Sequence, residues 1–474
     1  MNPATSVQKP FGGPVTGQWD RRLWGLLFVL AGNMLIDALE VSTMVVALPS
    51  AGRDLGLPLT GAQWLITAFA AGFGGLGLFG GRLVELLGRR RMYLWALLGF
   101  AAASLAGGVA SEPAVVIAAR LLKGFFAALT APTGLAIIAS SFRSGPDRDR
   151  AVSVYSLFGG FGFTAGLLLS GVLTSVSWRW TFVSPAPLVL VLLAFAVRLI
   201  PRDVPAPTSR RQFDVTGALA LTGTLLCLVQ GITSVPAHGW LGPRTAVPLG
   251  LAVVLATLLA VTERTAPRPL IQGRLFRNRT LVRSMAGAAA LNGSYLGLLL
   301  IMTARLQDGL GWSAPRTALA FLPAAAPLAV TALLSRLLIA RYGTARLIAL
   351  GAVAPPAGYL LCLWHPVPEH YATDVLPTML LVGAGFVLAF AALNAQSTSR
   401  LAAVDRPAAI GLYQSAVQMS AVVVPALAAA LAVGRSDDRP ALWLVTAVGL
   451  AGLVAGLSGL CNRPAQARHP STGE

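Results

Sequence analysis

The chain has 474 residues, of which 55% are hydrophobic and only 11% are charged. A soluble domain carries about a quarter charged residues, so a water-exposed globular fold and intrinsic disorder are both excluded. The net charge of +18 does not indicate nucleic-acid binding, because the basic residues lie in short clusters between apolar runs. The composition therefore predicts an all-α integral membrane protein that lies in a lipid bilayer and has no nucleic-acid partner.

A membrane-spanning helix needs about 20 mostly apolar residues. Fourteen such runs follow one another, at residues 24–48, 61–80, 92–110, 113–141, 151–175, 181–200, 214–234, 246–263, 282–304, 315–338, 345–365, 373–394, 407–433 and 440–461. We expect six spans, an inserted pair and six more. The expected domains are a tail (1–22), a six-helix bundle (23–200), linkers with the inserted pair (201–281), a second six-helix bundle (282–461) and a tail (462–474). No cleavage site follows the polar start, so we expect the first helix itself to direct insertion.

The basic residues test this topology. With the N-terminus in the cytoplasm, the inside segments hold 27 Lys and Arg residues and the outside segments hold seven. Cytoplasmic loops are enriched in these residues, and a miscounted span would mix the two sets. The partition predicts that both termini are cytoplasmic. Lys occurs only at Lys9 and Lys123, a bias that indicates a GC-rich genome, and we expect a multi-pass protein of the bacterial inner or plasma membrane.

Two similar segments join the second and third spans of each six-span group. The first, residues 81–91, reads GRLVELLGRRR, and the second, residues 336–343, reads RLLIARYG. Weak internal repeats of this kind are typical of transporters whose two halves rock about a central site.

The first segment and three others resemble the major facilitator superfamily, specifically its fourteen-span drug:proton antiporters, over residues 23–461. The similar stretches are residues 39–49 in the first span, 81–91 in the loop, 120–124 in the fourth span and 162–171 in the fifth span, followed by Trp178 and Trp180. The chain departs from the usual motifs at Glu40 and Glu85 (usually Asp), Lys123 (usually Gln), Leu167 (usually Pro) and Ser170 (usually Gly).

The resemblance implies proton-coupled efflux of small amphipathic or cationic molecules, such as drugs, antibiotics or secondary metabolites, by alternating access. It also implies no enzymatic activity, no cofactor besides the driving protons and function as a monomer. An importer or exporter of one metabolite or siderophore is the main alternative. An intramembrane enzyme is disfavoured, since the interiors of the spans hold no histidine and no paired-Asp site, and a receptor would not need charges inside the membrane.

Four ionisable residues lie inside spans, where charge is costly and functional by default. They are Asp37 and Glu40 in span 1, and Arg120 and Lys123 in span 4. At 1.5 Å per residue in a core about 30 Å thick, Glu40 and Arg120 lie at similar depths, roughly 20 Å from the inner edge. By the same measure Asp37 and Lys123 lie roughly 15 Å from it. We expect these pairs to form and to carry proton coupling, since burial favours a neutral carboxyl and a nearby cation favours an ionised one. A static cluster that fixes helix packing is the alternative.

The loop segment predicts a cytoplasmic gate, with Gly81 and Gly88 as turn residues. Its other members are Glu85, Arg89 and Arg90, and an ordinary inside-positive loop is the alternative. Glycines at positions 162, 166 and 171 place small residues on one face of span 5, which favours close helix packing. The resemblance assigns this face (Gly162, Gly166, Gly171) to the antiporter motif, and ordinary packing explains it equally well.

Polar residues within two later spans are candidate substrate contacts, because such groups fix ligands in apolar cavities. They are Asn292, Tyr295, Tyr413, Gln414 and Gln418, and hydrogen bonds between helices explain them equally well. No metal site is expected. His365 and His370 share one loop but are read as solvated residues, and the cysteines, Cys227, Cys362 and Cys461, have no metal-ligand or redox spacing.

Overall fold

The computed structural model describes residues 19–461, except 144, 203–214, 266–271, 365–369, 403–404 and 433–437. The N-terminal helices are α1 (Arg21–Asp54), α2 (Leu59–Ala62), α3 (Trp64–Leu87), α4 (Arg89–Val109), α5 (Pro113–Ser141), α6 (Pro146–Val176), α7 (Arg179–Val183) and α8 (Pro185–Leu199). A hairpin of α9 (Val215–His238) and α10 (Pro243–Thr265) follows. The C-terminal helices are α11 (Arg279–Ala304), α12 (Ala314–Ala320), α13 (Leu322–Tyr342), α14 (Thr344–Trp364), α15 (Leu376–Ser397), α16 (Arg406–Ala432) and α17 (Arg439–Cys461). Short turns η1 (Gly273–Arg277), η2 (Arg305–Gly309) and η3 (Tyr371–Val375) adjoin them.

Twelve helices of the described chain are long and apolar enough to cross a membrane. Helices α3 and α13, of 24 and 21 residues, occupy the positions of the two remaining expected spans. The multi-pass, all-helical prediction is thus confirmed, and the count of fourteen stays a prediction. The expected span at 113–141 coincides with α5, which begins at a proline, a residue that is favoured in the first turn because its missing N–H needs no partner there.

Three expected elements differ from what was predicted. Span 6 is divided at Ser184, directly before Pro185, and span 10 is divided at Phe321, two residues before Pro323. A proline cannot donate a backbone hydrogen bond, so both runs restart there. The loop after span 2 is shorter than expected, because α3 continues to Leu87. Gly81 is therefore a helical residue, and its assignment to a turn was wrong.

The two segments of the internal repeat, residues 81–91 and 336–343, each contain a glycine with the same backbone conformation. Gly88 ends α3 with φ of 88°, and Gly343 ends α13 with φ of 75°. Each glycine donates its N–H to the carbonyl four residues earlier, at 3.1 Å and 2.9 Å. Positive φ is costly for residues with a Cβ, so the two glycines stop their helices in the same way and start α4 and α14 in the same manner.

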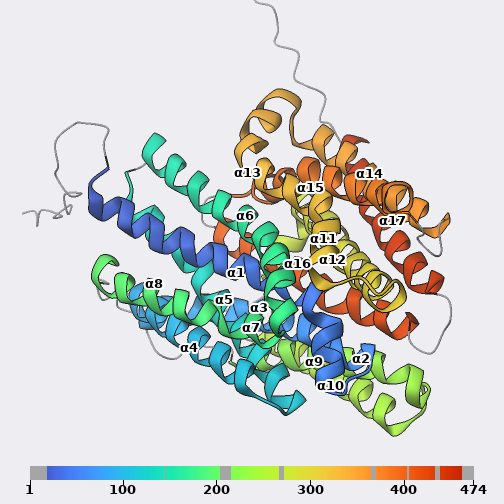
Figure 1. The fold of residues 1–474 in the computed structure, drawn as a ribbon. Helices are drawn as coiled ribbons and strands as arrows, with labels where there is room; N and C mark the ends of the chain where they lie inside the picture. The colour runs from blue at the N-terminus through green and yellow to red at the C-terminus, as the bar shows by residue number, and fades with distance from the viewer. Residues whose placement is uncertain are drawn as a thin grey trace, which may run out of the picture.

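The long helices form two packed groups with the α9–α10 hairpin beside them (Figure 1). In the N-terminal group, α1 packs on α6 and α8, α5 packs on α3 and α4, and α4 packs on α8. In the C-terminal group, α11 packs on α15, α16 and α17, and α14 packs on α15 and α17. Outside the hairpin, helix α9 packs mainly on α3 of the N-terminal group and on α16 of the C-terminal group. The hairpin thus lies where the two groups meet.

The two groups also touch directly along α3–α16 and α6–α13. Thr164 of α6 donates its hydroxyl to the carbonyl of Ala325 at 2.8 Å. Ser415 of α16 donates to the carbonyl of Gly74 at 3.2 Å. Each contact pairs a small hydroxyl with a main-chain oxygen, which lets the helices approach closely.

The end of α1 carries further contacts to the C-terminal group. Arg53 forms an exposed ion pair with Asp308 at 3.0 Å. The neighbouring Gln307 is buried and donates its amide to the carbonyl of Val46 at 2.9 Å. The groups are therefore joined at the face where α1 ends.

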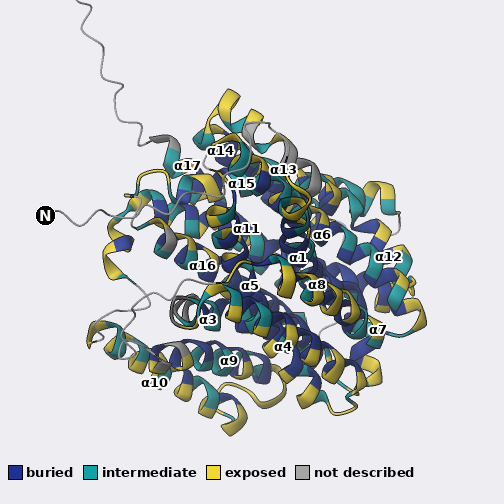
Figure 2. Cartoon of the chain, turned by 90° about the vertical axis from the view of Figure 1, so that its left-hand side faces the viewer, coloured by how far each residue is buried: buried dark blue, intermediate teal, exposed yellow. Residues whose placement is uncertain are grey.

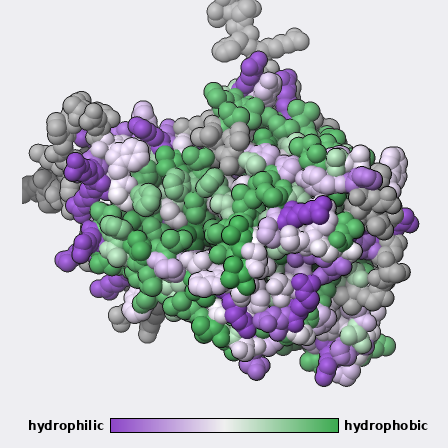
Figure 3. All heavy atoms as spheres, viewed as in Figure 1, coloured by the Kyte–Doolittle hydropathy of each residue, from purple (hydrophilic) through white to green (hydrophobic). Residues whose placement is uncertain are grey.

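The surface bears the large apolar side chains that a lipid environment requires. Buried residues lie toward the middle of the helix assembly, and exposed residues lie on its outside (Figure 2). Hydrophobic residues cover much of the surface in Figure 3, while hydrophilic ones lie at its left edge and across the lower right part of the face. Among the exposed apolar residues are Trp95, Phe195 and Val253. Their exposure would be unfavourable in water and is favourable in a bilayer.

Candidate functional site

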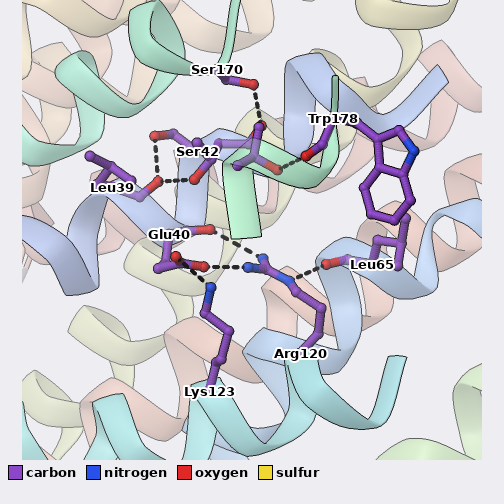
Figure 4. A network of polar contacts seen from close by, with 10 residues as sticks. Leu39, Glu40, Ser42, Leu65, Arg120, Lys123, Ser170 and Trp178 are labelled. Carbon is purple, nitrogen blue, oxygen red and sulfur yellow. Dashed lines mark hydrogen bonds and ion pairs between the residues drawn. The ribbon is translucent and has the colours of Figure 1, made fainter. Parts of the chain in front are cut away.

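A fully buried carboxylate on α1 lies between two cations on α5. Glu40 accepts from Arg120 Nη1 through Oε2 at 2.6 Å and from Lys123 Nζ through Oε1 at 2.7 Å. Figure 4 shows both basic side chains pointing at this carboxylate from the same helix. All three residues are at most 1% exposed. The predicted Glu40–Arg120 contact is confirmed.

Arg120 also holds the backbone of two other helices. Its Nη2 donates to the carbonyl of Glu40 at 3.1 Å, and its Nε donates to the carbonyl of Leu65 on α3 at 2.7 Å. The guanidinium thus joins α1, α3 and α5. Such multiple bonds satisfy a buried charge that would otherwise be very costly.

Aromatic rings complete the shell around the cations. The guanidinium carbon of Arg120 lies 4.9 Å from the ring centre of Phe69, and Lys123 Nζ lies 5.1 Å from that of Phe100. Phe182 of α7 faces both cations, at 5.8 Å from Arg120 and 5.1 Å from Lys123. Ring faces attract cations, and more so where water is excluded. These phenylalanines were not identified from the sequence, because a phenylalanine in an apolar run carries no distinguishing signal.

Two glycines set the spacing of α3 and α5 beside this cluster. A Cβ at Gly124, next to Lys123, would lie 2.0 Å from the carbonyl oxygen of Phe69. A Cβ at Gly72 would lie 2.1 Å from that of Leu121. The backbones are therefore in direct contact, and this contact brings Arg120 within reach of Leu65.

We expect Gly124→Ala to lower the free energy of unfolding by about 1–3 kcal/mol, the usual cost of overpacking, because backbone atoms must move. Gly250→Ala in α10 is the control, since nothing lies within 4 Å of its added Cβ, and it should be neutral or slightly stabilising. The measurement is thermal unfolding of the purified protein in detergent. Equal melting temperatures for the two variants would contradict the close approach of α3 and α5.

Asp37 lies one turn from Glu40 on α1 and has different partners. Its Oδ2 accepts from Asn33 Nδ2 at 2.9 Å and from the Thr130 hydroxyl at 2.8 Å. Asp37 is 4% exposed, and it forms no ion pair among the residues that the structure describes. The site therefore holds two carboxyls of different kinds, one bound by cations and one bound by neutral donors.

The predicted Asp37–Lys123 pair was wrong, since Lys123 donates to Glu40. The prediction compared only the depths of Cα atoms. Side chains lean toward the N-terminus of their own helix, and the order of contacts along α1 and α5 is antiparallel. Asp37 and Lys123 therefore lean apart, and Lys123 leans toward the level of Glu40.

We expect Lys123→Gln to be tolerated, with a loss of stability of about 1 kcal/mol. The Glu40–Arg120 pair stays neutral, and the new amide can still donate to Glu40. Arg120→Gln is the comparison, because it removes bonds to both Glu40 and Leu65 and should destabilise several times more. Unfolding in detergent gives both values. A Lys123→Gln variant as unstable as Arg120→Gln would show that both cations are needed to balance Glu40.

The small residues of span 5 pack against the helix that carries both acids. A Cβ at Gly162 would lie 2.4 Å from the carbonyl oxygen of Leu35, and one at Gly166 would lie 2.2 Å from the Ser42 hydroxyl. Gly171 instead faces α12, with Ala318 Cβ at 2.8 Å from its added Cβ. Close packing of this face is confirmed, and its role in antiport stays a prediction.

Hydroxyls on α1 and α6 add to that packing. Ser170, where the family usually has glycine, donates to the carbonyl of Thr43 at 2.5 Å (Figure 4). Ser42 donates to the carbonyl of Phe163 at 2.7 Å. The serine at 170 thus adds a helix-to-helix bond where a glycine would offer none.

The predicted gate is described only in part. The side chain of Glu85 lies outside the described part of the structure, and of Gly81 only the helical backbone is described. Arg89 donates to the carbonyl of Ala136 in α5 at 3.5 Å, and Arg90 donates to that of Val197 in α8. These bonds stay within the N-terminal helices, and the gating role stays a prediction.

The candidate substrate residues separate into buried and exposed ones. The ring of Tyr295 lies between Phe163 of α6, at 5.8 Å, and Phe386 of α15, at 4.7 Å, so it lies where the two helix groups meet. The hydroxyls of Tyr295 and Tyr413 are buried, and neither has a hydrogen-bond partner among the described residues.

The other three candidates take different positions. Asn292 of α11 donates to the carbonyl of Val417 of α16 at 3.1 Å. A hydrogen bond between helices was the expected alternative to substrate binding. The Cβ of Gln418 would lie 2.7 Å from a Cβ added at Gly74 of α3, so Gln418 packs between the groups. Gln414 is exposed and does not join them. The assignment of all five to substrate binding stays a prediction.

No group of three or more His, Cys, Asp or Glu residues that could hold a metal occurs in the described part of the chain. His365 lies outside that part. Cys362 is buried, and its sulfur accepts from Arg305 at 3.5 Å.

Comparison with known proteins gives a consistent result. The family model of the Major Facilitator Superfamily matches residues 30–404. The chain is 35% identical over 420 residues to a puromycin resistance protein of Streptomyces alboniger, covering 88% of this chain and 83% of that protein. It is 33% identical over 383 residues to a cephamycin export protein of Amycolatopsis lactamdurans, covering 80% and 79% of the two.

Solved structures show the same architecture at low identity. A D-xylose-proton symporter superposes with a TM-score of 0.67 at 14% identity, covering 94% of this chain and 98% of that one. A peptide transporter in complex with sulfate gives 0.66 at 18% identity, covering 92% and 94%. At such identity the likeness concerns the fold alone.

Proposed function

The chain belongs to the major facilitator superfamily and is a membrane transporter of small molecules rather than an enzyme, and from this premise we propose that it exports drug-like molecules in exchange for protons. The expected substrates are small amphipathic or cationic compounds. The relatives named for antibiotic resistance and export support this proposal. The observation that carries it is the buried group of Asp37, Glu40, Arg120 and Lys123.

We further propose the topology that suits this function. Fourteen spans would be arranged as six, two and six, in bundles of residues 23–200 and 282–461 with the linkers and pair at 201–281. Both tails, 1–22 and 462–474, would lie in the cytoplasm. The protein would act as a monomer in a bacterial cell membrane.

Asp37 is the better candidate for the proton carrier. A proton on Glu40 would weaken two ion pairs, whereas a proton on Asp37 would weaken none among the described residues. With all four groups ionised their formal charges cancel, so protonation of Asp37 leaves one net positive charge. That positive charge would weaken the binding of a cationic substrate, and loss of the proton from Asp37 would strengthen this binding. Proton and substrate thus compete.

The driving force is sufficient for export. Exchange of one proton for a monovalent cation moves no net charge and would be driven by the pH difference alone. Exchange of one proton for a neutral molecule moves one net charge, which at about 150 mV releases roughly 3.5 kcal/mol. That energy corresponds to a gradient of a few hundredfold.

Everted membrane vesicles test the proposal. An acidic lumen should drive accumulation of a cationic dye or of puromycin, and an uncoupler should abolish it. Membranes without the protein are the control. Accumulation instead in right-side-out vesicles would favour the alternative, an importer of a metabolite or siderophore. A susceptibility panel in an efflux-deficient host would then narrow the substrate.

A further inference from the structure

A pocket lies in the C-terminal group, away from the α1–α5 charges. It is enclosed by the first turns of α11 and α14, the last turn of α15 with the residues after it, and α17, which lie together in Figure 1. Its volume is about 370 Å³. This size accommodates a phosphate ester with part of its carrier. In the proposed topology all four helix ends face the cytoplasm.

The pocket is strongly basic. Arg279, Arg283 and Arg400 line it, together with the polar Gln396 and Ser399, and no carboxylate occurs among its lining residues. Asp405, which comes five residues after Arg400, forms an ion pair with Arg274 at 2.6 Å. Three arginines at one pocket create a positive potential that attracts an anion.

One side chain connects the two segments that carry Arg279 and Arg400. Asn278 caps α11, with its side-chain oxygen accepting from the N–H groups of Thr280 and Leu281 at 3.0 and 3.1 Å. Its amide nitrogen donates to the carbonyl of Arg400 at 3.2 Å. Arg279 and Arg400 therefore lie on segments that one side chain connects, which reduces the cost of ordering them around a ligand.

The other walls favour a ligand with an anionic end and an apolar part. Thr344 and Ala345 form the first turn of α14, where the helix dipole is positive. The lining also includes the apolar residues Ile348, Leu393 and Ala455. Arginine forks match phosphate oxygens in geometry as well as in charge.

We propose that this pocket binds a phosphate ester, carried either by an anionic phospholipid of the adjoining leaflet or by a soluble molecule. Basic pockets between membrane helices at the cytoplasmic side suit anionic head groups. The site does not include the acids of α1 and is independent of the proposed proton coupling.

The test uses the purified full-length protein in neutral detergent, titrated with phosphatidylglycerol, phosphatidylcholine or glycerol 3-phosphate. Occupancy is read by native mass spectrometry, and Tm is measured in parallel. The paired change Arg279→Gln with Arg400→Gln should weaken phosphate-ester binding roughly tenfold or more. The matched control is Arg277→Gln with Arg346→Gln, which removes two exposed arginines that do not line the pocket. That control should bind as the wild type does.

A steric variant separates the pocket from surface charge. Nothing lies within 4 Å of a Cβ at Gly459, which lines the pocket, so Gly459→Phe should fill the space without a backbone clash. It should weaken binding while every arginine remains, and Gly459→Ala should not.

The three titrated ligands distinguish a lipid from a soluble source of the phosphate ester. Binding of phosphatidylglycerol but not of glycerol 3-phosphate assigns the pocket to lipid, and the reverse assigns it to a soluble ester. Equal binding of phosphatidylcholine and phosphatidylglycerol, equal losses in the control pair, or full binding by Gly459→Phe would each overturn the proposal.

Discussion

Replacing Glu40 with Gln is expected to lower the free energy of unfolding by about 3–5 kcal/mol, the usual cost of leaving a buried charge without its partner. The change removes the single carboxylate that Arg120 and Lys123 share. Two cations would then face each other in a space with almost no solvent. Folded yield and thermal unfolding in detergent are the measurements.

A double-mutant cycle makes this result specific. Adding Lys123→Gln to Glu40→Gln should restore part of the stability, because one of the two uncompensated cations is removed. The matched comparison combines Lys123→Gln with Asp37→Asn, and these effects should add, since the two residues do not bond to each other. A coupling energy larger for Asp37 than for Glu40 would contradict the observed pairing.

Asp37→Asn is expected to reduce proton-driven accumulation by about a hundredfold or more, the scale of losing a coupling group worth roughly 3 kcal/mol. The fold should be nearly unaffected, because the variant breaks no ion pair and an amide can still meet Asn33 and Thr130. Proton-driven uptake into everted vesicles measures coupling. Substrate counterflow, which needs no net proton movement, should persist.

Thr130→Val is the control for Asp37. It removes one hydrogen bond to the carboxyl but keeps the titrating group, so it should shift the pH dependence of transport without abolishing it. Accumulation by Asp37→Asn at the wild-type level would eliminate Asp37 as the carrier and leave Glu40 as the candidate.

Much of the fold followed from the sequence because a bilayer imposes strong rules. Apolar length located the helices, as α5 illustrates by beginning at Pro113 and ending at Ser141. The charge pattern identified Glu40 and Arg120 as partners, since a charge inside the membrane needs a counter-charge at its own depth. These inferences used only one dimension, the position along the membrane normal.

The predictions that were wrong or missing depend on how each helix is rotated about its axis and on where its side chains point. Lys123 was matched to the wrong acid because its side chain leans toward the N-terminus of α5 and so reaches Glu40 rather than Asp37. Asn33 could have been found, since it precedes Asp37 by four residues on one helix face. Thr130 could not, because nothing in the order of residues reveals how α1 and α5 are rotated. The arginine pocket was hidden for the same reason, as Arg279 at the start of α11 and Arg400 after α15 lie far apart in the sequence and were counted merely as inside charges.

The α9–α10 hairpin makes the two flanks of the molecule unequal toward surrounding lipid. Helix α9 packs on both α3 and α16, so it covers the seam where these helices meet. The α6–α13 seam lies on the opposite flank from the hairpin (Figures 1 and 2). A solute already dissolved in the bilayer would meet a covering hairpin on one flank and α6 and α13 directly on the other. Lateral entry from the membrane is therefore expected to be one-sided, past the Thr164–Ala325 hydrogen bond.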